Sequence, residues 1–205
     1  MPSHRGHQKK VEKKKKKRLA VQRAVRAEAA PLGKNATLRL AAESPFGPAF
    51  MTPSWRDDSV PPRLVNVVLT RQLPDGTFFV MSHMVDRAFF GVKSAFAGSM
   101  SPGELDDLLE QTGDAYQEDL EKVSVLEAQS VIFHAVDFAR SLGLEPDGDF
   151  ASDLVGPRPD VLLDTPLARP NQPHYVEGPY DDPVRVARAL AMHAAAPSRL
   201  DASSE

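Results

Sequence analysis

The chain contains no cysteine and no apolar run long enough to cross a membrane. Without cysteine there can be no disulfides, no thiol nucleophile and no zinc or iron–sulfur site held by thiolates. A membrane-spanning helix needs about 20 consecutive apolar residues. The lysine-rich start is not followed by the apolar segment of about 7 to 15 residues that a secretory signal carries. We therefore expect a cytoplasmic protein with no membrane partner.

The common catalytic signatures are also missing. The sequence has no GxSxG, HExxH, Walker A or GxGxxG pattern, and so offers no recognised hydrolase, zinc protease or nucleotide-binding site. We expect no cofactor, no metal site and no catalytic residue, and the sequence favours a non-enzymatic protein.

Charge is distributed unevenly along the chain. The whole sequence has 25 basic and 28 acidic residues, for a net charge of −3. Residues 1–30 contain 11 Lys or Arg against two acidic residues, and residues 31–205 contain the other 14 basic residues against 26 acidic ones. A basic leader of charge +9 thus precedes an acidic body of charge −12. This asymmetry is typical of a protein with one end that binds a polyanion.

The basic leader, residues 1–30, is predicted to bind nucleic acid. Each phosphate that a cation neutralises releases counterions, so such a segment binds in a salt-sensitive and sequence-tolerant way. The segment should be disordered alone and able to form a helix once phosphates screen its charges. RNA or the ribosome is the preferred partner, DNA an alternative, and the segment has too few bulky apolar residues for a membrane. The predicted contacts are Arg5, Lys9, Lys10, Lys13, Lys14, Lys15, Lys16, Lys17, Arg18, Arg23 and Arg26.

The rest of the chain divides into a segment rich in Pro and aromatic residues (31–63), an α+β body (64–196) and a tail (197–205). The aromatic residues between the prolines of 31–63 predict a segment that wraps along the body and buries them. Trp55 is interpreted as a packing anchor rather than a base-stacking platform.

An antiparallel hairpin is the clearest element of the body. Two runs rich in β-branched and aromatic residues, 64–70 and 77–85, flank the turn-forming Pro74, Asp75 and Gly76. Both faces are apolar, which predicts a hairpin covered on both sides or central in its sheet. We expect the strand to break at Gly91 and a short strand at 174–176.

Two capping boxes predict helices. Ser101 with Glu104 begins an acidic helix, and Ser124 with Glu127 begins the longest helix. The longest helix is expected to end near Leu142, with Gly143 as its left-handed C-terminal residue. A third helix is expected to begin at Pro183, with Asp182 as its N-cap. The predicted inward-facing residues of this third helix are Val184, Ala187, Leu190 and Ala191. The predicted fold is an antiparallel, hairpin-containing sheet packed against two or three helices.

Four side chains are candidates for a pocket between the hairpin and the long helix: His83, Asp86, Lys93 and His134. Beside Asp86, Lys93 can bind an anion or hold the chain through an ion pair, and we favour the ion pair. His134 and Asp137 stand three residues apart on one helix, but a structural histidine is the preferred interpretation. An enzyme using this pocket is the first alternative function. An adaptor whose acidic helix binds a basic protein is the second.

Four motifs occur together in the body: VVLTRQLPDG (67–76), GVKSA (91–95), LGLEPDGDF (142–150) and GPYDD (178–182). Together they resemble a little-studied bacterial family of small α+β proteins, some with lysine-rich N-termini. The resemblance covers about residues 64–195 and implies the fold without an activity. Members of that family often carry a histidine after the proline of the third motif, where this chain has Asp147. If that histidine has a chemical role, this protein lacks it.

Overall fold

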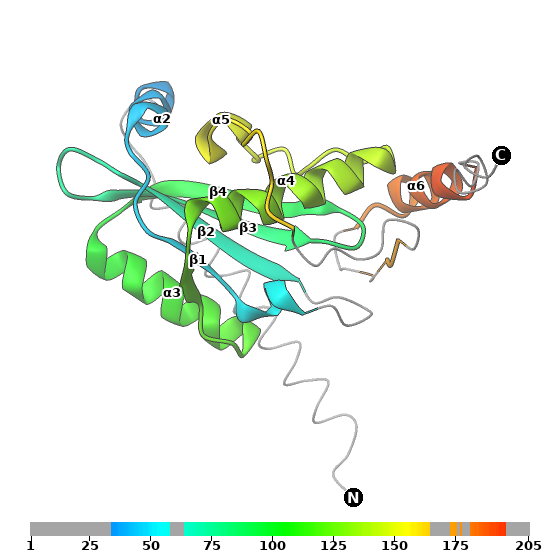
Figure 1. Cartoon of the computed structure of the whole chain (residues 1–205), viewed down its shortest axis with the longest axis horizontal. Coiled ribbons are helices and arrows are strands. Elements are labelled where there is room, and N and C mark those ends of the chain that lie inside the picture. Colours follow the sequence, from blue (N-terminus) through cyan, green and yellow to red (C-terminus); the bar gives the residue numbers. More distant parts are fainter. Residues whose placement is uncertain (1–33, 58–63, 165–172, 176, 178–180, 196–205) are drawn as a thin grey trace, which may run out of the picture.

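The computed structural model describes residues 34–57, 64–164, 173–175, 177 and 181–195. In this part of the chain a five-stranded antiparallel sheet packs against helices on both faces, which confirms the predicted α+β class (Figure 1). The predicted leader and tail fall outside the described residues. No helix within the described ranges is long and apolar enough to span a membrane.

The sheet has the strand order β4-β3-β2-β1-β5, and each neighbouring pair is antiparallel. Its strands are β1 (Ala49–Met51), β2 (Val65–Gln72), β3 (Phe78–Asp86), β4 (Gly91–Met100) and β5 (Glu121–Val123). The predicted hairpin is β2 with β3. In its turn Gly76 has a φ of +85°, and the Asp75 carboxylate accepts the Thr77 amide at 3.0 Å. Nearly every residue of the hairpin strands is buried, as two apolar faces predict.

The predicted break after the hairpin is present but lies at residues 87–90, and Gly91 begins a further strand, β4, that the sequence does not predict. The chain turns tightly through residues 87–90 and runs back along the full length of β3. Gly91 has a φ of +68°, and a Cβ there would lie 2.9 Å from the Ala135 carbonyl oxygen. The glycine is therefore needed both by the turn and by the close approach of the strand to a helix. Low strand propensity in β4 is overridden by pairing with β3.

The segment 31–63 does more than wrap the body. Residues 34–43 form helix α2 (Lys34–Glu43), β1 lies between β2 and β5 in the sheet, and a 3-10 turn, η1 (Pro53–Arg56), follows. Met51 and Trp55 are buried. The Trp55 indole donates from Nε1 to Glu121 at 2.7 Å, so this residue is the packing anchor that the sequence indicates.

Two helices cover the two faces of the sheet, and both begin with the predicted capping boxes. In α3 (Pro102–Tyr116) the box joins Ser101 and Glu104, and in α4 (Val125–Ser141) it joins Ser124 and Glu127. Figure 1 shows α4 above the sheet and α3 below it. Buried apolar residues of α4, such as Val131 and Ile132, pack on one face of the hairpin. Leu105 and Leu108 of α3 pack on the other face.

A smaller apolar cluster joins the end of α4 to α6 (Pro183–Ala195). The short helix α5 (Ser152–Val155) packs in the main core instead. The Asp182 carboxylate caps α6 by accepting the Val184 amide at 2.9 Å, as predicted. The predicted inward face of α6 is wrong. Val186 and Ala189 are buried, whereas the four residues expected inside are exposed, namely Val184, Ala187, Leu190 and Ala191. The faces of an alanine-rich helix differ little in hydrophobicity, so the surface against which α6 packs determines which of its faces is buried.

The predicted strand at 174–176 is not present at His174 or Tyr175, while residue 176 lies outside the described ranges. The His174 amide donates to the Ala88 carbonyl at 3.1 Å, and the Tyr175 ring packs against Phe89 and Phe90. This segment is therefore held by side-chain packing and one backbone bond.

Candidate functional site

His83 lies in the core of the sheet, on the face that α4 covers. It is 3% exposed, its Nδ1 has no hydrogen-bond partner, and its ring meets the edge of Phe150 at 5.8 Å between centroids. Burial lowers the pKa of this imidazole to about 4. The side chain is therefore neutral near pH 7, and its surroundings are those of a packing residue.

Asp86 closes the turn between β3 and β4. Its carboxylate accepts the amides of Ala88 at 2.9 Å and Phe89 at 3.0 Å, as a turn-forming aspartate does. Burial raises the pKa of this carboxyl, with the turn amides and Lys93 opposing the effect. The Asp86 carboxylate therefore serves to hold the backbone of the turn.

Lys93 does not pair directly with Asp86, which corrects the ion pair expected from the sequence. Its Nζ lies 2.9 Å from Asp181, and it also sits 4.6 Å from the centroid of the Phe90 ring. The Tyr175 hydroxyl donates to the same carboxylate at 3.3 Å. Burial, followed by the charge of Asp181, raises the pKa of Tyr175. These contacts tie the segment before α6 to the start of β4.

His134 also stands apart from its expected neighbour. Its Nε2 lies 3.0 Å from the carbonyl oxygen of Leu163, while Asp137 binds both terminal nitrogens of Arg158, one at 2.9 Å. The half-buried histidine thus contacts the chain that follows α5. The structural interpretation of His134 fits these contacts.

The four candidates do not converge on one site. His83 faces α4, whereas Asp86 belongs to the turn and Lys93 points to Asp181. Of the four, only Asp86 and Lys93 interact, through their charges. Within the described ranges, no group of three His, Asp or Glu side chains is placed to hold a metal ion. Among the described residues, these four side chains therefore form no acid–base or nucleophile–base pair with one another.

Two buried arginines were missed by sequence reasoning, because nothing in a strand pattern marks them. Arg87 is 1% exposed and donates to the carbonyls of Trp55, Ser54 and Asp57, at 2.8 to 2.9 Å. Arg71 donates to the carbonyls of Ser44 and Leu154. Arg87 thus binds carbonyls in and just after η1, and Arg71 binds a carbonyl of α5 and one just after α2. Both are part of the fold, and neither offers a free charge to a ligand.

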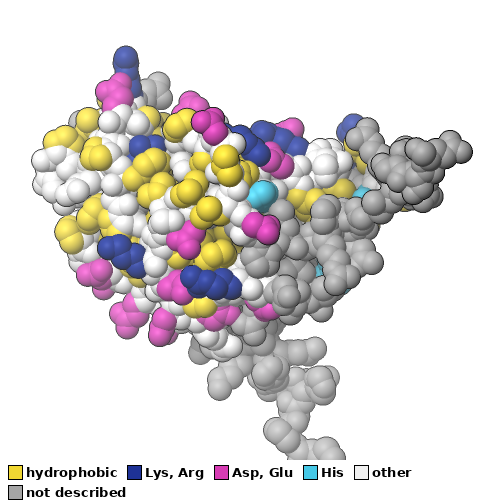
Figure 2. Space-filling model, in the orientation of Figure 1, with side chains coloured by type: hydrophobic (Ala, Val, Ile, Leu, Met, Phe, Trp, Pro, Cys, Tyr) yellow, Lys and Arg dark blue, Asp and Glu magenta, His cyan; other side chains and the backbone are white. Residues whose placement is uncertain are grey.

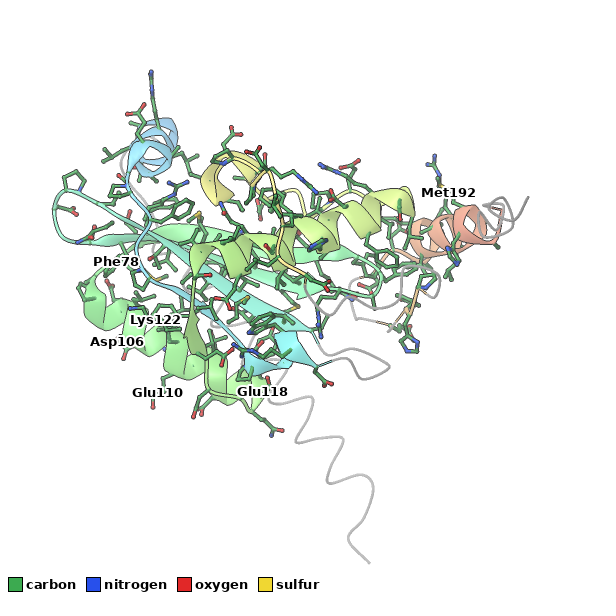
Figure 3. The ribbon with its side chains drawn as sticks, in the orientation of Figure 1. Phe78, Asp106, Glu110, Glu118, Lys122 and Met192 are labelled. Atoms are coloured by element: carbon green, nitrogen blue, oxygen red, sulfur yellow. The ribbon has the colours of Figure 1, made fainter. Side chains whose placement is uncertain are left out.

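The outward face of α3 is acidic. Figure 2 shows acidic side chains along the lower left of the molecule, over α3, and Figure 3 shows Asp106 and Glu110 on its outer side. None of the exposed carboxylates on this face forms an ion pair with a described residue; they are Asp106, Asp107, Glu110 and Asp114. Glu118 and Glu121, by contrast, accept from Ser54 and Trp55.

Most cations of the body already have partners. Five described ion pairs hold Arg39, Arg56, Lys93, Arg140 and Arg158. Arg71, Arg87 and Arg185 donate to backbone carbonyls. Of the remaining described cations, the exposed Lys122 lies on β5 and the exposed Arg188 on α6. The basic residues predicted to bind nucleic acid all lie in the leader, outside the described ranges.

Comparison with known proteins gives no relative. No protein family, no curated protein and no solved structure matches the chain. The resemblance stated from the four motifs stays a prediction.

Proposed function

We propose that the chain is a cytoplasmic, non-catalytic protein that docks through its basic leader onto RNA, with the ribosome as the favoured assembly. The leader's 11 basic residues, among them the run Lys13 to Arg18, bind backbone phosphates. Phosphate contacts carry little sequence information, so the leader recognises the density of phosphates in a folded RNA rather than a base sequence.

The partition of charge carries this proposal. Most cations of the described body are held in ion pairs or on carbonyls, whereas the leader has only two acidic residues for its 11 basic ones. Positive charge that could attract a polyanion is therefore concentrated in one segment.

The acidic body shapes how the leader binds. The exposed carboxylates on α3, which form no ion pair with a described residue, repel phosphates within about a Debye length, roughly 8 Å at physiological salt. This repulsion disfavours contact between RNA and the α3 face. The body then projects away from the RNA, and the leader makes the contact.

The test is RNA binding across a salt series, with the full chain and two leader variants. Replacing Lys13 to Lys17 with glutamine should weaken binding and reduce the slope of log affinity against log salt by about 3 to 4 for single-stranded RNA. Replacing the same five lysines with arginine keeps the charge and should preserve both affinity and slope. The arginine variant is the matched control for altered chain conformation.

Binding to purified ribosomes, structured RNA and duplex DNA under the same conditions identifies the polyanion. Affinity that does not depend on salt, or that survives the glutamine changes, contradicts the proposal. Preference for duplex DNA over RNA would keep the leader as the binding element and overturn the choice of RNA.

A second function is favoured by the acidic face of α3, whose exposed carboxylates have no cation among the described residues. An adaptor of this kind binds a basic protein through α3. Changing Asp106, Asp107 and Glu110 to their amides should abolish binding to such a partner, and deleting residues 1–30 should not. The leader proposal predicts the reverse for RNA.

A further inference from the structure

Strand β4 is one edge of the sheet, and its outward backbone groups can be identified. The Gly47 amide donates to the Thr70 carbonyl at 2.9 Å, so the backbone of Thr70 points away from β3. Val80 lies opposite Thr70 and Gly98 lies opposite Val80. In antiparallel sheets the direction alternates from residue to residue, so Val80 and Gly98 bond to one another. The N–H and C=O groups of the residues beside Gly98, Ala97 and Ser99, therefore point outward.

This part of the edge is accessible in the described structure. The start of β4 is covered, because the Asp147 amide donates to the Val92 carbonyl at 2.8 Å. Ala97 and Ser99 are exposed, and no backbone group of the described residues bonds to their outer side. The free part of the edge is thus centred on Gly98.

The features that usually prevent edge pairing are lacking here. Charged side chains, prolines and very short strands block the addition of another strand. At the opposite edge β5 has three residues, two of them charged. From Ser94 to Met100, β4 has neither charge nor proline, and its one irregular register lies earlier, opposite Met84 and Val85.

From this edge we infer that two copies of the chain pair through β4, antiparallel about a two-fold axis at Gly98. In this register the backbone groups of Ala97 bond to those of Ser99 in the second copy, and the reverse bonds follow from symmetry. The pairing uses the outward groups that are exposed and none that Asp147 covers. It continues one sheet through both chains.

The side chains fit the same register. The two Gly98 residues face each other at the axis as a non-hydrogen-bonded pair, where the Cα atoms of antiparallel strands come closest. Phe96 of each copy lies across from Met100 of the other, on the α3 side of the sheet. Met100 is already buried in the single chain, whereas Phe96 is only partly buried, so the pairing covers the part of Phe96 that would otherwise face water. A partner of identical sequence supplies both members of each pair, which is why a second copy is the chosen occupant.

Sedimentation of nuclease-treated full chain over a wide concentration range tests the inference. The wild type should form a dimer, and Ala97→Pro should raise its dissociation constant at least about tenfold, since each copy loses an outward donor and gains a ring at the contact. The Ala97 amide does not bond to β3, so proline there leaves the β3–β4 ladder intact. Ala97→Ser retains the donor and should dimerise like the wild type.

Cross-linking gives an independent readout, because the chain has no cysteine. Ser99→Cys should be joined to its symmetry mate by a short bis-maleimide, whereas Ser152→Cys on α5 should not. A wild type that stays monomeric at high concentration, or equal cross-linking at both positions, overturns the inference. Deleting residues 1–30 should leave the dimer unchanged, so the outcome is separate from that of RNA binding.

Discussion

The buried imidazole of His83 should make the protein sensitive to mild acid. In the unfolded chain a histidine has a pKa of about 6.5, whereas in the folded protein burial lowers the pKa of His83 to about 4. The unfolded state therefore takes up a proton at a higher pH than the folded state. Above the pKa of the histidine in the unfolded chain, His83 is neutral in both states and costs no free energy of unfolding. The free energy of unfolding then falls as the pH decreases from about 6.5 to about 4.

The size of the loss follows from the two values. A tenfold difference in a protonation equilibrium is worth about 1.4 kcal/mol, which predicts a loss of about 2.5 kcal/mol at pH 4.5 and about 3 kcal/mol at lower pH. For a domain with an unfolding free energy of about 5 to 15 kcal/mol, this is a large fraction. The orphaned Nδ1 fits this expectation, because protonation would place an unpartnered donor in the core.

Urea unfolding at about pH 7 and about pH 4.5 measures the effect. Carboxylates also titrate in this range, so the decisive quantity is the difference between the wild type and His83→Leu. The variant should lose about 2.5 kcal/mol less than the wild type on acidification. Met81→Leu, at a buried position of the same strand that does not titrate, should lose as much as the wild type. Equal acid sensitivity in the wild type and His83→Leu would refute the reasoning.

Three further substitutions test the packing of the site region. Gly91→Ala should cost about 2 to 4 kcal/mol in urea unfolding, because the left-handed φ and the contact with α4 both oppose a Cβ, whereas Gly103→Ala, with open space around it, should be neutral or stabilising. A double-mutant cycle of Lys93→Met and Asp181→Asn should give a coupling of about 1 to 2 kcal/mol, and additive effects would contradict a direct pair. Ser124→Ala should cost about 1 kcal/mol by removing the α4 cap, and Ser124→Asp should restore most of that loss.

Local signals in the sequence were sufficient for part of the fold. The hairpin was predicted because Asp75 and Gly76 determine a turn between two strand-forming runs, and the helices because Ser101 and Ser124 each face a glutamate three residues on. These features depend on neighbouring residues, so no knowledge of distant contacts was needed.

The missed elements depend on distant contacts. Strand β4 has a low strand propensity and becomes a strand because the edge of β3 binds it along its whole length. Strands β1 and β5 have three residues each, too few for a periodic pattern, and they pair across a long stretch of sequence. The Lys93–Asp181 contact joins residues that are 88 positions apart. Asp86 is close to Lys93 in the sequence and was therefore the expected partner. In the structure the Asp86 carboxylate accepts amides of the turn, and Lys93 pairs with Asp181.

If the leader binds RNA and the chain also pairs through β4, the dimer should bind long RNA more tightly than a single chain does. A dimer through β4 carries two leaders, and once one leader binds a long RNA, the second binds the same molecule at a high effective concentration. A leader of about 30 residues spans at most roughly 100 Å when extended, so both can reach phosphates of one folded RNA. Affinity for a long RNA should then exceed that for a short oligonucleotide that accommodates one leader. Ala97→Pro should reduce the first affinity to the level of the second and leave the second unchanged. If the variant binds long RNA as tightly as the wild type does, each leader binds RNA independently, whether or not two chains pair through β4.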